Sequence, residues 1–247
     1  MQIHVNCQSC PNKNCPVKYC SPEWQDKISH QKNLVIYPKG QYVIVEDSLV
    51  LGAFFIQEGK VKVVSSNFRG KEQTVRLASN GHMVGHMGIG NETYPIGAVA
   101  LEDSKICFLD NQTLYNAFME NPQFIFQVMM FYSRELRKSE LRAKCFAQMN
   151  NEEKVIFGLI YMIDTFGIAQ EDQTINISLA RQEIADIVGT NAEQVSRAFA
   201  FLKHKKIIET KEKRIQILNT NELIRLITCY LKPSDTTIIS TQFASPQ

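Results

Sequence analysis

The apolar positions of this chain follow two periods, and the change between them divides the sequence. Between residues 34 and 109, short apolar runs are separated by turn signals such as Pro38-Lys39-Gly40 and Glu58-Gly59. Short alternating runs at regular spacing are typical of a small antiparallel barrel or roll. The strands of this roll are expected near residues 33–37, 42–45, 53–56, 61–64, 74–77, 97–101 and 105–109.

Beyond residue 111 the apolar period becomes helical. A short helix is expected to end before Pro122, because the residue ahead of a proline disfavours helical backbone. A long helix then runs to about residue 148, and a further helix spans about residues 151–166.

The long helix carries a stripe at alternating steps of four and three, which is typical of a coiled-coil seam. The members of this seam are Ile125, Met129, Tyr132, Leu136, Ser139, Ala143 and Phe146. The seam predicts self-pairing into a homodimer, and the polar Ser139 makes that pairing weak enough to be switched. Packing of the same stripe on the chain's own roll is the alternative.

Residues 181–202 predict two short helices with a sharp turn at Gly189. Apolar residues recur at spacings of three and four on one face of each helix, and glycine is favoured where a helix ends and the chain reverses. Glu193, Ser196 and Arg197 fall on the opposite face of the second helix, near its start. This arrangement is a helix-turn-helix, in which such residues meet base edges in the major groove of DNA. A plain helical hairpin with solvated charges is the alternative.

The formal net charge of +2 says little about nucleic acid, but the distribution of charge is informative. Residues 175–217 contain eight Lys or Arg against five Asp or Glu. This local excess follows the second short helix, where the phosphates of a bound duplex would lie. A solvated charged surface is the alternative.

No apolar run is long enough to span a bilayer, and the N-terminus lacks the apolar segment of a signal peptide. We therefore expect a cytoplasmic protein with no membrane partner. Its seven cysteines are then expected to be reduced, metal-bound or redox-active rather than paired in disulfides. The sequence contains no nucleophile–base pair, phosphate loop or paired carboxylates at useful spacing, so we do not expect an enzyme.

Four cysteines lie within fourteen residues near the N-terminus: Cys7, Cys10, Cys15 and Cys20. A Cys-x2-Cys pair lets two sulfurs bind one metal centre. Tetrahedral zinc fits all four, at the spacing of a zinc knuckle with Cys15 in the place of its histidine. An iron–sulfur cluster also needs four thiolates but accepts one from a distant segment. Free thiols in a disordered tail are the third possibility.

A roll, a long seam helix and a helix-turn-helix with a basic wing, in that order, resemble the bacterial transcription factors of the CRP/FNR superfamily. The resemblance covers residues 34–218, and its DNA-binding signature is Arg181-Gln182-Glu183-Ile184-Ala185, Val188-Gly189 and Glu193-x-x-Ser196-Arg197. It implies an α+β fold with a cyclic-nucleotide-binding-like double-stranded β-roll, a dimerisation helix and a winged helix-turn-helix. The implied divisions are a Cys-rich segment (1–24), a sensor roll (25–121), a dimerisation helix (122–149), a DNA-binding domain (150–232) and a mobile tail (233–247).

The cyclic-AMP-binding branch of this superfamily uses a glutamate for the ribose and an arginine for the phosphate. The matching segments here read Gly85-His86-Met87-Gly88 and Ile96-Gly97, with neither charge. A buried phosphate without its arginine would be uncompensated. We therefore expect no cyclic AMP.

The FNR branch carries an N-terminal Cys-x-x-Cys, a third cysteine soon after and a distant fourth in the roll, all holding an oxygen-labile iron–sulfur cluster. Cys7-Gln8-Ser9-Cys10 is similar to that pair, and residues 100–107, ending at Cys107, are similar to the segment with the fourth ligand. The resemblance implies a 4Fe–4S cluster whose third ligand is either Cys15 or Cys20. Zinc or no metal is the alternative.

The resemblance also implies roles in DNA binding and sensing. Glu193, Ser196 and Arg197 would read TTGA-type half-sites of double-stranded DNA, with RNA polymerase as a further partner. Phosphates would be positioned by Ser178, Arg181, Lys211, Lys213 and Arg214. Oxygen or nitric oxide would destroy the cluster and weaken both pairing and DNA binding. Alternatively, an unknown small molecule binds in the roll near His82 and His86.

Overall fold

The computed structural model describes residues 5–68, 70 and 72–232, so the tail expected to be mobile lies outside the described residues. Within these ranges the chain forms two compact units that divide after Arg134. The division falls inside helix α3 (Pro122–Gln148), which begins and ends where the apolar period predicted. The domain limits drawn from the sequence remain predictions.

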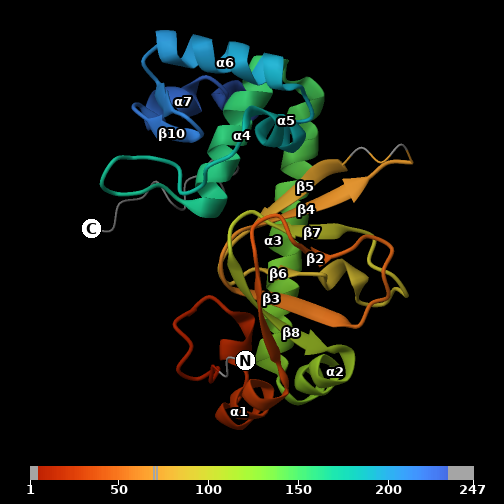
Figure 1. The fold of residues 1–247 in the computed structure, drawn as a ribbon. Helices are drawn as coiled ribbons and strands as arrows, with labels where there is room; N and C mark the ends of the chain where they lie inside the picture. The colour runs from red at the N-terminus through yellow and green to blue at the C-terminus, as the bar shows by residue number, and fades with distance from the viewer. Residues whose placement is uncertain (1–4, 69, 71, 233–247) are drawn as a thin grey trace. The chain divides into compact units, whose positions relative to one another are not determined.

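The first unit contains two antiparallel sheets, each with four strands among the described residues (Figure 1). One sheet has the order β1 (Asn33–Tyr37), β8 (Ser104–Asp110), β3 (Gly52–Glu58) and β6 (Met83–Val84). The other has the order β2 (Tyr42–Ile44), β7 (Gly97–Ala100), β4 (Val61–Ser66) and β5 (Glu72–Ala78). The predicted roll is confirmed, and β6 is an additional strand of only two residues.

Two apolar cores share the strands of this roll because successive side chains on a strand point to opposite faces. Ile56 of β3 and Ile106 of β8 lie in a core with Val61 and Ala98 of the second sheet. Their neighbour Phe55 lies in the other core, and the partly buried Cys107 packs against that core. That second core covers the outer face of the sheet that contains β3 and β8.

Helices and the N-terminal segment complete the second core. Its members come from η1 (Pro16–Tyr19), α1 (Pro22–Gln31), α2 (Asn111–Glu120) and the first part of α3. Helix α1 was not predicted, although its start is clearly encoded: the Ser21 hydroxyl accepts from the Trp24 amide, and Pro22 occupies the first helical position. A short turn of helix, η2 (His86–Gly88), follows β6.

The second unit contains the remainder of α3 and α4 (Asn151–Phe166), α5 (Arg181–Val188) and α6 (Ala192–His204). A hairpin of β9 (Ile208–Lys211) and β10 (Arg214–Ile217) follows, then α7 (Thr220–Arg225) and η3 (Thr228–Tyr230). Gly189 ends α5 with a φ of 70°, in the left-handed region that favours glycine. Gly158 lets α4 approach α5, because a Cβ there would lie 2.3 Å from Val188 Cγ1. The predicted helix-turn-helix is confirmed.

Within the described ranges, no helix is long and apolar enough to cross a membrane.

Candidate DNA interface and cysteine pocket

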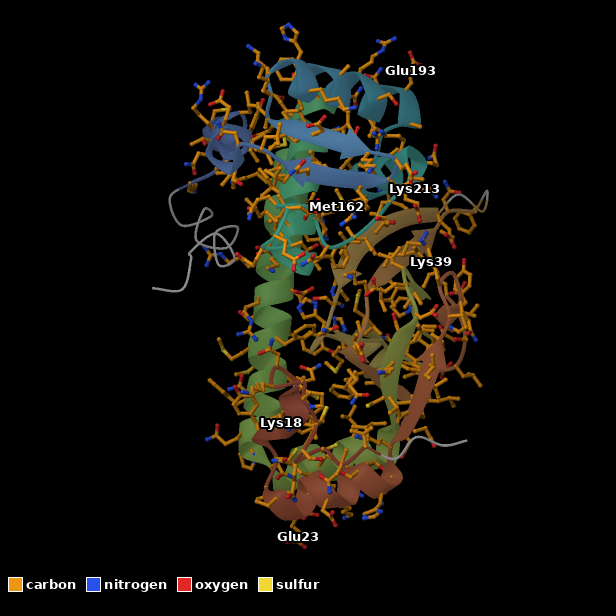
Figure 2. All side chains as sticks on the ribbon, turned by 60° about the vertical axis from the view of Figure 1, so that its left-hand side comes forward. Lys18, Glu23, Lys39, Met162, Glu193 and Lys213 are labelled. Carbon is orange, nitrogen blue, oxygen red and sulfur yellow. The ribbon has the colours of Figure 1, made fainter. Side chains whose placement is uncertain are left out.

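Helix α6 presents one buried and one exposed face. Its start is capped by the Asn191 side chain, which accepts a 3.0 Å hydrogen bond from the Gln194 amide. The buried face anchors the helix through Val195, Ala198, Phe199 and Leu202. Glu193, Ser196 and Arg197 lie on the exposed face, and Figure 2 shows Glu193 projecting away from the helix.

The exposed side chains of α6 are held loosely. Arg197 donates to Glu193 Oε1 at 2.6 Å, and both side chains are 68% exposed. An ion pair in this setting contributes at most about 1 kcal/mol, so a duplex can open it at low cost. The Ser196 hydroxyl donates to the Ala192 carbonyl at 2.9 Å. The arrangement therefore leaves a carboxylate, a hydroxyl and a guanidinium available to base edges on one face.

The candidate phosphate contacts surround this helix within the second unit. The Arg181 guanidinium lies 4.0 Å from the centre of the Phe199 ring, and burial lowers the pKa of Arg181. Ser178 is exposed just before α5. Lys211 and Lys213 are exposed at the tip of the β9–β10 hairpin, with Lys213 visible in Figure 2. The third hairpin residue, Arg214, pairs with Asp172 at 3.4 Å in a pair that stays solvent-exposed.

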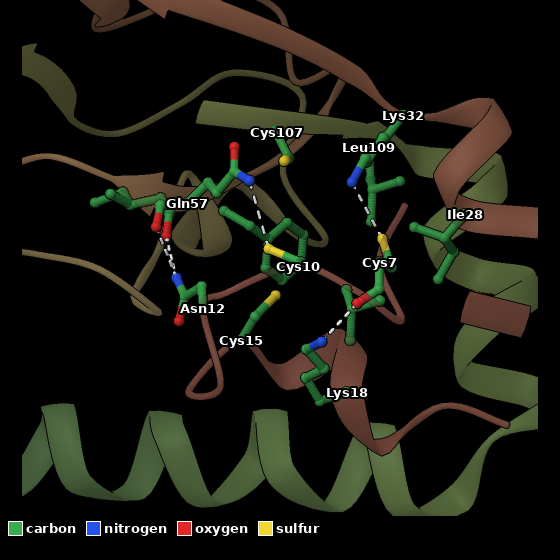
Figure 3. Close-up of a pocket in the computed structure, with 13 residues that line it drawn as sticks. Cys7, Cys10, Asn12, Cys15, Lys18, Ile28, Lys32, Gln57, Cys107 and Leu109 are labelled. Carbon is green, nitrogen blue, oxygen red and sulfur yellow. Dashed lines mark hydrogen bonds between the residues drawn. The ribbon is translucent and has the colours of Figure 1, made fainter. Parts of the chain in front are cut away.

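Four of the five candidate ligand cysteines line one pocket (Figure 3): Cys7, Cys10, Cys15 and Cys107. The first three come from the N-terminal segment and the fourth from β8. The sulfurs of Cys10, Cys15 and Cys107 point into the same space. Counted together with the open solvent at its mouth, this space measures about 420 Å³.

The N-terminal segment is fixed beside β3 by residues other than cysteine. Asn12 donates from Nδ2 to the carbonyls of Ile56 and Gln57, at 2.9 and 3.0 Å. Gly81, with a φ of 85°, allows the segment to come close, because a Cβ there would lie 2.6 Å from Asn14 Cβ. The pocket is therefore shaped by protein contacts that need no metal.

Two of the pocket's sulfurs receive hydrogen bonds. Lys32 Nζ lies 3.2 Å from Cys7 Sγ, and Gln57 Nε2 lies 3.4 Å from Cys10 Sγ. Lys18 donates to the Cys7 carbonyl at 2.6 Å. Sequence reasoning missed all three residues, because no motif marks a lysine or a glutamine that reaches a distant sulfur.

Burial raises the pKa of two of the pocket thiols. It raises the pKa of Cys15 to about 12 and that of Cys107 to about 11, although Lys32 acts in the opposite direction on Cys107. Neighbouring cysteines add to the rise in both cases. A metal ligand must be a thiolate, so metal binding would release protons from this pocket.

The two metal chemistries require different sulfur arrangements. Four thiolates around one zinc ion would lie about 3.8 Å from one another, given a Zn–S distance of about 2.3 Å. Among the described residues, no three His, Cys, Asp or Glu side chains converge closely enough for a single ion. An iron–sulfur cluster binds each thiolate through a different iron and so accepts a wider set. Cys7, Cys10, Cys15 and Cys107 are the residues that would supply the four thiolates of such a cluster.

Cys20, the remaining candidate, does not line this pocket. It is 5% exposed in the core beside η1, and burial, with Cys7 nearby, raises its pKa to about 12. Of the two candidates for the third ligand, Cys15 lines the pocket with Cys7, Cys10 and Cys107, whereas Cys20 lies near Cys7 but outside the pocket.

His86 is enclosed by aromatic rings of α3. It is 6% exposed, and the ring centres of Phe131 and Tyr132 lie 5.2 and 5.0 Å from its own. The Tyr132 hydroxyl donates to the His86 carbonyl at 2.5 Å. Burial, with a contribution from Arg76, lowers the pKa of His86 to about 3, so the ring is neutral at pH 7.

His82 lies farther out, with its ring centre 6.2 Å from that of Phe131. Arg76, which the sequence argument did not consider, donates to the Met83 carbonyl at 2.8 Å and lies 5.3 Å from the Phe131 ring centre. A ligand at the two histidines, and the absence of cyclic AMP, both remain predictions.

The seam of α3 lies on an uncovered face of the helix. Six of its residues are exposed and Phe146 is partly exposed. Other residues of α3 face the cores: Phe124, Val128 and Phe131 in the first unit, and Leu141 and Cys145 in the second. The chain's own roll is therefore packed mainly by a different stripe. Of the seam residues, Tyr132 also contacts His86 and Phe146 contacts Phe157, whereas Ile125, Met129 and Leu136 are exposed.

The two halves of the chain match two known domain families. Residues 34–121 match the cyclic nucleotide-binding domain, and residues 153–226 match the Crp-like helix-turn-helix domain. A cyclic nucleotide-binding domain followed by a Crp-like helix-turn-helix places this chain in the class of DNA-binding transcription regulators.

Relatives and solved structures agree with that class. The chain is 26% identical over 189 residues to the transcriptional activator protein Anr of Pseudomonas aeruginosa, covering 76% of this chain and 78% of that protein. It is 24% identical over 229 residues to the fumarate and nitrate reduction regulatory protein of Escherichia coli, covering 90% of each. Its fold matches that of FixK2 from Bradyrhizobium japonicum with a TM-score of 0.71 at 20% identity, covering 79% and 96%. The chain belongs to the CRP/FNR superfamily of transcription regulators.

Proposed function

We propose that this regulator binds DNA as a homodimer under the control of a 4Fe–4S cluster held by Cys7, Cys10, Cys15 and Cys107. The signal is then oxygen, nitric oxide or the redox state of the cell. One observation carries the proposal: an N-terminal loop and a strand about a hundred residues away bring four cysteines to one pocket. The name of the Escherichia coli relative, a fumarate and nitrate reduction regulatory protein, also supports it.

The signal would pass from the cysteine pocket to α3 through the packing that the N-terminal loop shares with this helix. A bound cluster supplies an oxygen-sensitive link between the N-terminal loop and β8. Cys7 and Val17 of the loop share one core with Phe124, Val128 and Phe131 of α3. Loosening of the loop therefore removes packing from one side of α3, while the seam occupies another side. Pairing and DNA affinity would fall together by linkage.

The exposed seam supports the homodimer. Ile125, Met129 and Leu136 are 46%, 56% and 62% exposed, an unusual amount for apolar side chains in one helical row. Burying such a row against a second copy removes apolar area from water, at about 25 cal/mol per Å². A dimer would present two copies of α6 to half-sites about 34 Å apart.

The exposed face of α6 supports sequence reading. Arg197 can donate two hydrogen bonds to guanine, Glu193 can accept from cytosine and Ser196 can contact a neighbouring base. These are the groups that a TTGA-type half-site requires. Ser178, Arg181 and the hairpin residues position the phosphates without reading sequence.

The experiment is iron and acid-labile sulfide analysis of anaerobically reconstituted protein. We expect about four of each per chain, with a broad visible absorption that bleaches in air. Serine in place of Cys7, Cys10, Cys15 or Cys107 should abolish both, whereas Cys20→Ser should retain them. The exposed Cys229 provides a control through Cys229→Ser. Stoichiometric zinc without colour, or full loading of Cys107→Ser, would refute the proposed site.

A further inference from the structure

Two hydrogen-bond donors of the first unit reach sulfurs of the cysteine pocket. Lys32 follows the last residue of α1, where its backbone N–H bonds to the Ile28 carbonyl, and its ammonium lies 3.2 Å from Cys7 Sγ. Gln57 lies on β3, and its amide nitrogen lies 3.4 Å from Cys10 Sγ. Figure 3 shows the two donors approaching the pocket from different elements.

The Lys32 ammonium is set against a largely apolar wall. Ile28, Phe55 and Leu109 line the same pocket. Ligating thiolates add negative charge in these surroundings, and buried charge is costly unless an opposite charge compensates it. The Lys32 ammonium would supply that opposite charge directly at the Cys7 sulfur. A neutral thiol would not need it.

The orientation of the Gln57 amide points to the same sulfur chemistry. Its Oε1 is buried and has no hydrogen-bond partner among the described residues. A buried acceptor left unsatisfied costs about 1–3 kcal/mol. A thiol sulfur is only a weak acceptor for the N–H group, whereas an anionic sulfur is a strong one. A ligating thiolate at Cys10 would therefore be a stronger acceptor for this amide than a thiol would be.

Building on the proposed function, we propose that Lys32 and Gln57 are positioning residues that set the resistance of the cluster to oxidation. Both act through hydrogen bonds to ligand sulfurs, Lys32 to Cys7 and Gln57 to Cys10. The two donors belong to different elements, so each can be removed while the other stays in place.

The direction of the effect follows from charge. A cluster held by Cys7, Cys10, Cys15 and Cys107 would be open to one-electron oxidation by dioxygen, which would leave as superoxide. An ammonium or an N–H group beside the sulfurs stabilises the electron-rich side of this exchange, because hydrogen bonds to sulfur raise the reduction potential. Removing either donor should therefore make the electron easier to lose.

The test measures the rate constant for loss of visible absorption after anaerobically reconstituted full-length protein is mixed with air-saturated buffer. The variants are Lys32→Met, which keeps the aliphatic stem, Lys32→Arg, which keeps the charge, and Gln57→Leu. Lys39→Met, at an exposed turn, is the control for loss of one positive charge. The rate constant does not depend on the fraction of protein loaded, so incomplete reconstitution leaves the comparison intact.

We expect Lys32→Met to bleach roughly tenfold faster than the wild type, in line with other outer-shell substitutions. Gln57→Leu should bleach a few-fold faster, and Lys32→Arg should recover most of the wild-type rate. The reduction potential should fall in the same order. Rates for Lys32→Met and Gln57→Leu equal to that of Lys39→Met would overturn the inference while leaving the cluster in place. A wild-type protein that binds no iron and sulfide would instead refute the proposed function.

Discussion

The DNA-facing helix and the cysteine pocket expose their chemistry to different degrees. On α6, Glu193 and Arg197 are both 68% exposed and carry their charges in water. In the pocket, burial raises the pKa of Cys15 to about 12, so its thiol holds its proton. The base-facing side chains of the helix are already charged and exposed, whereas a metal in the pocket would first have to displace the proton of Cys15. A regulator of this kind can thus keep the DNA-contacting face of α6 unchanged while the cysteine pocket responds to the signal.

The two regions also differ in how they are assembled. The helix-turn-helix is built from one continuous segment, and the side chains proposed to meet bases lie within five residues of one another. The pocket combines a loop, the end of α1 and strands β3 and β8. Helix α3 has core-facing residues in both units and is the element through which the two regions would communicate.

The largest expected effect comes from breaking the seam of α3. Leu136→Glu places a charge on an apolar residue that is 62% exposed in one copy and would be buried in a dimer. Loss of one half-site should weaken binding to a two-half-site duplex by roughly 100-fold or more. Iron and sulfide content should stay at the wild-type level.

Analytical ultracentrifugation and fluorescence anisotropy with labelled DNA measure the two quantities. Gln123→Glu, at an exposed position of α3 outside the seam, is the matched control. A dimeric Leu136→Glu protein with wild-type DNA affinity would show that pairing uses another surface.

The next largest effects distinguish a residue that contacts bases from one that contacts phosphates. Arg197→Ala should weaken binding to a TTGA-containing site by roughly 1–3 kcal/mol and leave binding to random DNA nearly unchanged. Lys213→Ala should weaken both equally and reduce the salt dependence. Anisotropy titrations on both duplexes at two salt concentrations give these values. Equal losses on the two duplexes for Arg197→Ala would count against a base-reading role.

A smaller effect concerns His86, a buried titratable group in the roll. Its pKa is lowered to about 3 in the folded protein, against about 6.5 when unfolded. The unfolded chain therefore binds the extra proton between these values, so stability is lost as the pH falls below about 6.5. The loss attributable to this ring is about 2 kcal/mol at pH 5.

Urea unfolding followed by the fluorescence of Trp24, the sole tryptophan, measures this loss. His86→Phe should remove most of it between pH 7 and pH 5, whereas the exposed His204→Gln should not. Identical pH dependence in wild type and His86→Phe would mean that another group causes the acid sensitivity.

The sequence predicted local features better than assembled ones. The helix-turn-helix, α3 and most strands of the roll follow from periodicity, prolines and glycines, which act within a few residues. Helix α1 was missed although Ser21, Pro22 and the spacing of Trp24 and Ile28 mark it. Among the cysteines, spacing alone left Cys15 and Cys20 equivalent. The folded chain distinguishes them, because Cys15 lines the pocket and Cys20 does not.

Lys32 and Gln57 could not be predicted at all, since each reaches a sulfur on a segment that the fold, and not the sequence, brings near. The role of Cys107 could be predicted only in part. The alternation of β8 places it on the face opposite Ile106, but only the paired sheet and the N-terminal loop show what that face meets.

The most direct test of control by the pocket follows DNA affinity and visible absorption in one sample. Anaerobically reconstituted protein is titrated against a labelled duplex with two TTGA half-sites, and the titration is repeated as air bleaches the sample. We expect the affinity to fall in step with the absorption, and Cys107→Ser to show the low affinity from the start. An affinity that stays constant while the colour disappears would contradict control by the pocket.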